Sequence, residues 1–67
     1  MAVAKVTELS CTSNTSFEDA INQGVTRATK TLRNVKSAWI KEQQVRCEEG
    51  RITEYQVNMM VTFVLDE

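Results

Sequence analysis

Few of the side chains that usually carry catalysis occur in this sequence. Histidine is absent, and the two cysteines, Cys11 and Cys47, stand alone rather than in a Cys-x-x-Cys pair. The usual zinc-ligand spacings and every catalytic triad that needs an imidazole are therefore excluded. General acid–base chemistry would fall to Asp, Glu, Lys, Tyr or Cys, and no pair of these stands out. We expect no enzymatic activity, and we expect both thiols to be free.

Other residues are suited to holding a ligand without converting it. Trp39 offers a flat aromatic surface for stacking, and Gln43 and Gln56 offer amides that both donate and accept hydrogen bonds. Each also has a plainer role, because a tryptophan packs at subunit interfaces and a glutamine on a half-covered sheet bonds to solvent or to a neighbouring chain. Whether the three side chains act together depends on the elements that position them.

One helix is the clearest of these elements. Small and apolar residues recur at steps of three and four, the spacing of one helical face, at Phe17, Ala20, Ile21, Gly24, Val25, Ala28, Leu32 and Val35. Ser16 occupies an N-cap position, with Asp19 three residues later as an acidic variant of the capping box. The pattern predicts a helix from about Phe17 to Asn34.

Strands are predicted on both sides of this helix. Residues 2–10 are rich in Val and Thr, residues 36–48 read as a second strand, and Glu49-Gly50 forms a two-residue turn into a third. The third strand alternates, and its largely apolar face should cover the helix; that face consists of Tyr55, Val57, Met59, Val61, Phe63 and Leu65.

The turn fixes an expected register for the hairpin by pairing Glu48 with Arg51. On the helix side, Ile40 then meets Met59 and Ala38 meets Val61. On the opposite side, Trp39 meets Met60, Lys41 meets Asn58, and Gln43 meets Gln56. Because one helix covers only one side of a sheet, the second side presents large apolar and amide groups that nothing in one chain covers. We expect the function to lie on this second side.

Four segments of the chain resemble the dodecin family. They are Cys11-Thr12-Ser13-x-x-Ser16-Phe17-Glu18-Asp19-Ala20-Ile21, Arg27-Ala28-x-Lys30-Thr31-Leu32-Arg33, Glu54-Tyr55-Gln56-Val57 and Val61-Thr62-Phe63-Val64-Leu65. They span nearly the whole chain in the expected order. The resemblance implies an α+β fold of order β-α-β-β, a three-stranded antiparallel sheet wrapped around one helix, as a single domain over residues 1–67. It also implies a hollow homododecamer.

The resemblance further implies a cofactor. Flavin-binding dodecins hold pairs of flavins, riboflavin or FMN, at two-fold axes between subunits, with each ring stacked between tryptophans, and they are described as storing or buffering flavin. By position, Trp39 would be the stacking platform and Gln56 would bond to the polar edge of the ring. Arg46 would suit a flavin phosphate. Arg27 and Thr31 match helix positions that touch a phosphorylated ligand or a neighbouring subunit in some members.

The setting of the tryptophan departs from the family pattern. In typical flavin-binding members it opens the second strand as Trp-Phe-Glu-Val, whereas here it follows Ser37-Ala38, two positions later. An ungapped alignment places Ser37 in the tryptophan's position, and a gap with a shorter hairpin restores Trp39 and Arg46. The shift moves the indole about 6.6 Å along the same face. The alternative to a flavin store is a structural or cation-binding shell, since members without the tryptophan are described as ion binders.

Length and charge add further expectations. A chain of 67 residues buries little surface alone, and 42% hydrophobic residues favour self-association over disorder. Eight basic and nine acidic residues, with no run of one sign, give no basic patch for nucleic acid. No stretch approaches the ~20 apolar residues of a membrane span, and the N-terminus lacks the apolar core of a signal peptide. We therefore expect a cytoplasmic protein whose partner is itself.

Overall fold

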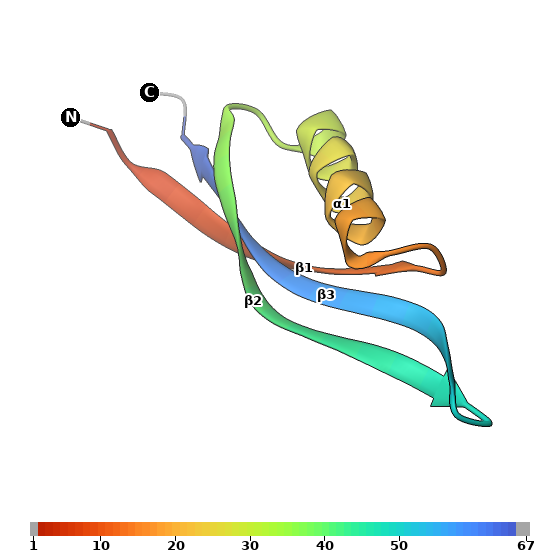
Figure 1. Ribbon diagram of the computed structural model, residues 1–67. Coiled ribbons are helices and arrows are strands. Elements are labelled where there is room, and N and C mark those ends of the chain that lie inside the picture. The colour runs from red at the N-terminus through yellow and green to blue at the C-terminus, as the bar shows by residue number, and fades with distance from the viewer. Residues whose placement is uncertain (1, 66–67) are drawn as a thin grey trace.

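A single helix lies against one side of a three-stranded antiparallel sheet in the computed structural model, which describes residues 2–65 (Figure 1). The elements are β1 (Ala4–Ser13), α1 (Phe17–Thr31), β2 (Val35–Glu48) and β3 (Arg51–Val64). The strand order is β1-β3-β2, so β3 is central and the other two strands form the edges. The predicted α+β fold of order β-α-β-β is confirmed.

Hydrogen bonds from small polar side chains fix the start of the helix. Ser16 is the N-cap, and its Oγ accepts a hydrogen bond of 3.0 Å from the backbone N–H of Asp19, as predicted. The Asp19 carboxylate accepts 2.6 Å bonds from the Ser13 hydroxyl and from the Gln23 amide. Ser13 is buried, and its Oγ also accepts from the backbone N–H of Thr15. These bonds hold the β1–α1 loop in one conformation.

The helix ends three residues earlier than predicted, at Thr31. Leu32 is extended and donates its N–H to the Ala28 carbonyl at 2.8 Å, and Asn34 takes a positive φ of 61°. Asparagine tolerates this left-handed conformation, which turns the chain into β2. The Asn34 side chain donates to the Val64 carbonyl at 3.2 Å and so ties the turn to β3.

The core lies between α1 and the middle of β3. Its buried hydrophobic residues are Ala20, Ala28, Val57, Met59 and Val61, and most of the predicted helical stripe packs against them. Small residues on α1 let the helix approach the sheet closely. A Cβ atom added at Gly24 would overlap the end of the Met59 side chain and the Cys11 thiol.

The β2–β3 hairpin turns as predicted at Glu49 and Gly50, both with positive φ (52° and 77°). The structure confirms the pairs Glu48–Arg51, Trp39–Met60, Ile40–Met59 and Ala38–Val61. The pairs predicted between these two ends are wrong. A β-bulge lies between Ile40 and Glu42, and a compensating irregularity follows between Arg46 and Cys47.

The bulge changes the partner of every strand residue between the two irregularities. Asn58 pairs with Glu42 rather than with Lys41, and Gln56 pairs with Gln44 rather than with Gln43. An extra residue in one strand shifts every later pair by one position. The later residues of that strand then lie on the opposite face of the sheet from the one expected. Counting from the turn assumed an uninterrupted ladder, which this hairpin does not have.

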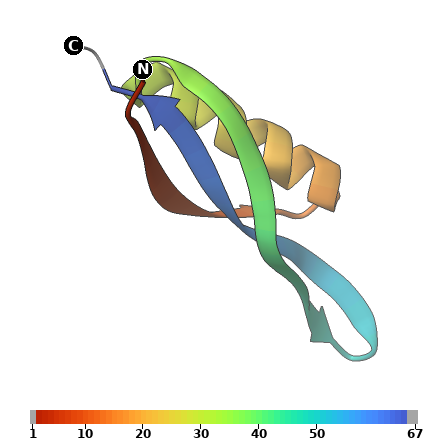
Figure 2. The same cartoon turned by 90° about the vertical axis from the view of Figure 1, so that its left-hand side faces the viewer.

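The hairpin extends past the last β1 pair, Ser13–Tyr55, as an arm, residues 45–55, with the Val45–Tyr55 pair at its base (Figures 1 and 2). It gives the chain its elongated shape of 52 × 19 × 13 Å. The helix covers the predicted apolar face of β3 at Val57, Met59 and Val61, all fully buried, but Leu65 is exposed. Val45 and Ile52 on the arm are exposed as well.

Substitution of Gly24 by alanine should lower stability. Overpacking a tight core typically costs about 1–3 kcal/mol, which exceeds the gain of about 1 kcal/mol in helix propensity. We expect a lower melting temperature at fixed protein concentration. Thr26→Ala, at an exposed position of the same helix, is the control and should melt as the wild type or slightly higher. Equal melting of both variants would show that α1 does not pack as closely as described.

Candidate functional site

The outer face is the side of the sheet turned away from α1. Paired residues of the three strands form rows across it, in the order β1, β3, β2: Glu8–Met60–Trp39, Ser10–Asn58–Glu42 and Thr12–Gln56–Gln44, followed on the arm by Glu54–Arg46. Three of the predicted site residues, Trp39, Gln56 and Arg46, therefore share one face. Ser10, Glu42, Gln44 and Asn58 belong to the same face and were not predicted as site residues.

Trp39 lies on the outer face of the edge strand β2. Its side chain is 50% exposed, and it pairs with the half-buried Met60. Residues 2–65 therefore leave half of this hydrophobic side chain exposed. A flat aromatic ligand or a second protein surface would remove that area from water.

Gln56 lies on the central strand and is held by hydrogen bonds across the sheet. Its Nε2 donates to the Ser10 hydroxyl at 3.1 Å and, at the long limit of 3.5 Å, to Oδ1 of Asn58. Asn58 in turn donates to the Glu42 carboxylate at 2.7 Å. The amide nitrogen is therefore engaged, whereas the Gln56 Oε1 accepts no hydrogen bond within residues 2–65. That oxygen is available to a ligand N–H.

An ion pair crosses the outer face beside the Trp39 row. The bulge residue Lys41 reaches over β3, and its Nζ lies 3.1 Å from Oε1 of Glu8 on β1. Both side chains are exposed, so the pair contributes little to stability. It neutralises the Glu8 carboxylate, which lies in the row of the indole but two strands away from it, and so lowers the negative charge of the face.

Arg46 lies further along the outer face, on the arm. Its Nε forms a 3.1 Å ion pair with Oε1 of Glu54, its partner across the strand pair. Neighbouring rows are two residues apart along a strand. The Arg46 row therefore lies about 20 Å from the Trp39 row, and the Gln56 row lies about 13 Å from the Trp39 row. Within one chain, Arg46 and Trp39 cannot contact the same small group.

The other three predicted site residues lie elsewhere. Gln43 pairs with Val57, which puts it on the helix side of the sheet, contrary to the expected pairing with Gln56. Thr31 is exposed at the last position of α1, and its hydroxyl donates to the Ala28 carbonyl at 3.5 Å. Arg27 lines a separate groove between α1 and β1. The structure does not bring these three residues together with Trp39.

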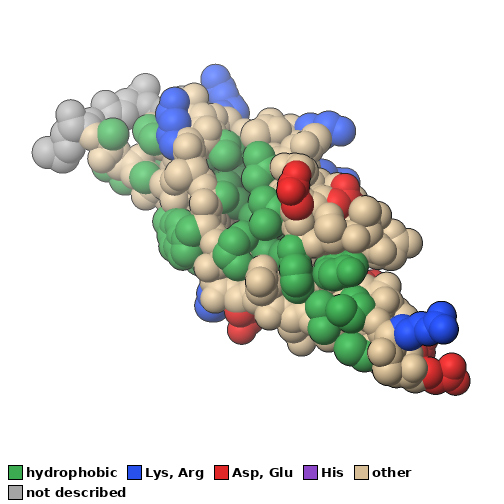
Figure 3. All heavy atoms as spheres, in the orientation of Figure 1, with side chains coloured by type: hydrophobic (Ala, Val, Ile, Leu, Met, Phe, Trp, Pro, Cys, Tyr) green, Lys and Arg blue, Asp and Glu red, His purple; other side chains and the backbone are tan. Residues whose placement is uncertain are grey.

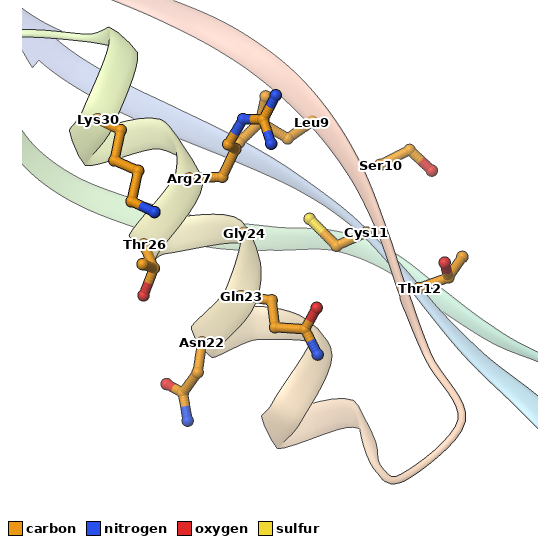
Figure 4. A pocket seen from close by; sticks show the side chains of 10 residues that line it. All are labelled: Leu9, Ser10, Cys11, Thr12, Asn22, Gln23, Gly24, Thr26, Arg27 and Lys30. Atoms are coloured by element: carbon orange, nitrogen blue, oxygen red, sulfur yellow. The ribbon is translucent and has the colours of Figure 1, made fainter.

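The groove containing Arg27 has a volume of about 530 Å³ (Figure 4). Leu9, Cys11 and Gly24 form its apolar part, and the side chains of Arg27 and Lys30 project from α1 along it. Burial raises the pKa of the Cys11 thiol. Cys11 and the exposed Cys47 are both free, as predicted.

Two negative observations apply to residues 2–65. Their one helix is neither long nor apolar enough to cross a membrane. In the same part of the chain, no group of three or more His, Cys, Asp or Glu side chains is placed to hold a metal ion.

Comparison with known proteins agrees with this geometry. The dodecin family model matches residues 3–66, so the chain belongs to the dodecin family. No curated protein sequence matches it significantly.

Crystal structures of several dodecins superpose closely on the chain. A mutant of Thermus thermophilus dodecin is 39% identical with a TM-score of 0.93, and each chain covers 100% of the other. Dodecin from Streptomyces davaonensis is 35% identical with a TM-score of 0.92, over 98% of this chain and 97% of that one. A calcium dodecin of Mycobacterium tuberculosis, described as having a novel calcium-binding site, is 31% identical with a TM-score of 0.82, over 96% and 91%.

The pKa shift of Cys11 predicts slow alkylation. Because burial raises the pKa and the thiolate is the nucleophile, the thiolate fraction at pH 7.5 is smaller than that of an ordinary thiol. In the Cys47→Ser variant, reaction with iodoacetamide should be at least several-fold slower than in urea, and its rate should rise at a higher pH than in urea. An unchanged pH profile on unfolding would contradict the burial of Cys11 beside Gly24.

Proposed function

We propose that this protein is a flavin-binding dodecin that stores or buffers riboflavin or FMN at the subunit interfaces of a homododecamer. The observation that carries the proposal is the outer face, where a half-exposed indole and an orientated amide lie on a sheet surface that no element of the described residues covers. Membership of the dodecin family supports both the ligand class and the self-assembly.

The chemistry of this face suits holding a ligand rather than converting it. Stacking on Trp39 would remove both the flavin ring and the indole from water. The Oε1 of Gln56 would accept a hydrogen bond from a ring N–H, because the Ser10 hydroxyl already holds the amide nitrogen. The face has no histidine, and its carboxylates Glu8, Glu42 and Glu54 are each engaged by a neighbouring side chain. Binding alone is sufficient for storage.

A second copy would complete the site. In one chain, only one side of a ring stacked on Trp39 would be covered, and a stored flavin needs both sides covered. A second outer face related by a two-fold axis would supply a second indole, since an isologous interface presents the same patch from both subunits. Burial of these faces would also supply the apolar area that a 67-residue chain lacks.

Arg46 would serve the phosphate of FMN. Only its Nε is engaged with Glu54, so the terminal Nη groups of the guanidinium have no ion-pair partner in the described chain. Because Arg46 lies far from Trp39 within one chain, it would contact a flavin held by another subunit or the phosphate at the end of the ribityl chain of FMN. This role remains secondary to that of Trp39 and Gln56.

A cation-binding shell is the second candidate. The observations that favour it are the similarity to the M. tuberculosis calcium dodecin and the carboxylates of Glu8, Glu42 and Glu54 on the outer face. No group of three potential ligands within residues 2–65 is close enough to hold a metal. A cation site would therefore need carboxylates from more than one copy.

Flavin titration distinguishes the two candidates. Riboflavin or FMN fluorescence should be quenched at micromolar protein, and Trp39→Ala should weaken binding by about tenfold or more, from the loss of a stacking partner worth over 1 kcal/mol. The Trp39→Phe variant keeps an aromatic ring and should bind flavin with an affinity between those of the wild type and Trp39→Ala. Absence of quenching by the wild type, or quenching unaffected by Trp39→Ala, would sink the proposal; calcium binding by calorimetry without flavin binding would favour the cation shell.

Gln56 and Gln43 form a matched pair for the same titration. Gln56→Leu removes an acceptor aimed at the ligand and should weaken flavin binding by about 2- to 10-fold, the value of one hydrogen bond. Gln43→Leu lies on the opposite side of the sheet and should leave the affinity unchanged. A larger effect of Gln43→Leu would contradict the bulged register and restore the uninterrupted one.

A further inference from the structure

The middle of the outer face is polar, although it lies beside the apolar Trp39 row. Its two rows consist of polar side chains alone, which are Ser10, Asn58 and Glu42 in one row and Thr12, Gln56 and Gln44 in the next. By contrast, Figure 3 shows hydrophobic side chains gathered along the chain and running out along the arm. A ligand on the middle of the outer face therefore meets hydrogen-bonding groups.

Four of these polar side chains are linked by hydrogen bonds that cross the sheet from β1 to β2. The Nε2 of Gln56 donates to the Ser10 hydroxyl at 3.1 Å and to Oδ1 of Asn58 at 3.5 Å. The Nδ2 of Asn58 donates to Oε1 of Glu42 at 2.7 Å. Both amides thus direct an N–H toward the next residue of the line, which ends at the Glu42 carboxylate.

Glu42 decides which way the two amides face. An ionised carboxylate only accepts hydrogen bonds, so Asn58 must turn its NH2 group toward Glu42 and its oxygen toward Gln56. Gln56 must then turn its own nitrogen toward that oxygen, because two facing amide oxygens would share no hydrogen. The Ser10 hydroxyl cannot make this choice, since it donates as readily as it accepts. The Gln56 Oε1 is left pointing to the ligand, and it accepts no hydrogen bond within residues 2–65.

We propose that Glu42, acting through Asn58, is a positioning residue that makes Gln56 present its carbonyl oxygen, so that the outer face selects a flavin ring with a free N–H. The imide N–H of the flavin ring is a donor of this kind. A ring methylated at that nitrogen would leave the Gln56 oxygen unpaired in the covered site, and such a loss strongly disfavours the analogue. The selection rests on the proposed function, whereas the orientation of the amides does not depend on flavin.

Reversal of the hydrogen-bonding character of residue 42 tests this role. The wild type should quench riboflavin with an affinity about tenfold or more above that for riboflavin methylated at the imide nitrogen. In Glu42→Lys the ammonium only donates, so Asn58 would turn around and Gln56 would present its NH2 group instead. The affinity ratio should then fall several-fold, toward one. In Glu42→Lys/Asn58→Asp the new carboxylate accepts from both neighbours, and the ratio should recover.

Two controls separate positioning from charge and from stacking. Glu48→Lys makes the same change of charge at the end of β2 and should keep the wild-type ratio. Trp39→Ala should weaken the binding of both flavins and leave their ratio unchanged. A wild-type ratio near one, a wild-type ratio in Glu42→Lys, or a double variant that fails to recover would each overturn the inference.

Side-chain amide NMR signals test the orientation without a ligand. The NH2 signals of Gln56 and Asn58 are assigned by their loss in Gln56→Leu and Asn58→Leu. Glu42→Lys should move both signals, and Glu48→Lys should move neither. A Gln56 signal that stays in place while that of Asn58 moves would refute the positioning role, whether or not flavin binds. Coupled amide signals in a wild type that quenches no flavin would contradict the proposed function and the selection of an N–H but not the orientation of Gln56, so the two failures are distinguishable.

Discussion

The close contact between α1 and the middle of β3 is the constraint on which the rest of the structure depends. Ala20, Gly24 and Ala28 follow one another at four-residue steps and bring the helix backbone close to Val57 and Met59. A 15-residue helix is about 22 Å long, whereas a 14-residue strand is about 46 Å long. The helix can therefore cover only about half of one side of the sheet.

The surfaces of the sheet that lie outside that contact remain available for binding other molecules. Within residues 2–65 no element covers the outer face, and the helix side of the arm extends beyond the first turn of α1, where Phe17 packs on Tyr55. A chain of this size has little stability to spare, and two unpartnered surfaces on opposite sides of one sheet favour assembly in more than one direction.

The parts of the fold predicted correctly are those with strong local signals. The helical stripe has a clear period, Ser16 is a good N-cap, and Gly50 permits the positive φ of the hairpin turn. The end of the helix was missed because Asn34, rather than a glycine or a proline, makes the left-handed turn. Membership of the dodecin family followed from four short segments that remain in order along the whole chain.

The register was predicted correctly at both ends of the hairpin and incorrectly between them. The two irregularities cancel, so Trp39 still meets Met60, but the residues between them exchange faces. No glycine or proline marks the bulge, and a bulge depends on the packing of the whole sheet rather than on local sequence. This is why Gln43 was assigned to the ligand face, whereas Glu42 and Gln44 were not.

The extra residue at Lys41 also decides which surfaces the arm presents. In an uninterrupted ladder, Arg46 would share the side of Ile40 and Ala38, facing the helix layer, and Val45 would lie on the side of Trp39. The bulge reverses this arrangement, so Arg46 lies on the outer face and Val45 lies on the helix side with Tyr55. One inserted residue thus places the Arg46 cation on the outer face with Trp39 and the apolar Val45 side chain on the helix side of the arm. The two surfaces are therefore coupled through the register of a single strand, and neither can be altered by shifting β2 without disturbing the other.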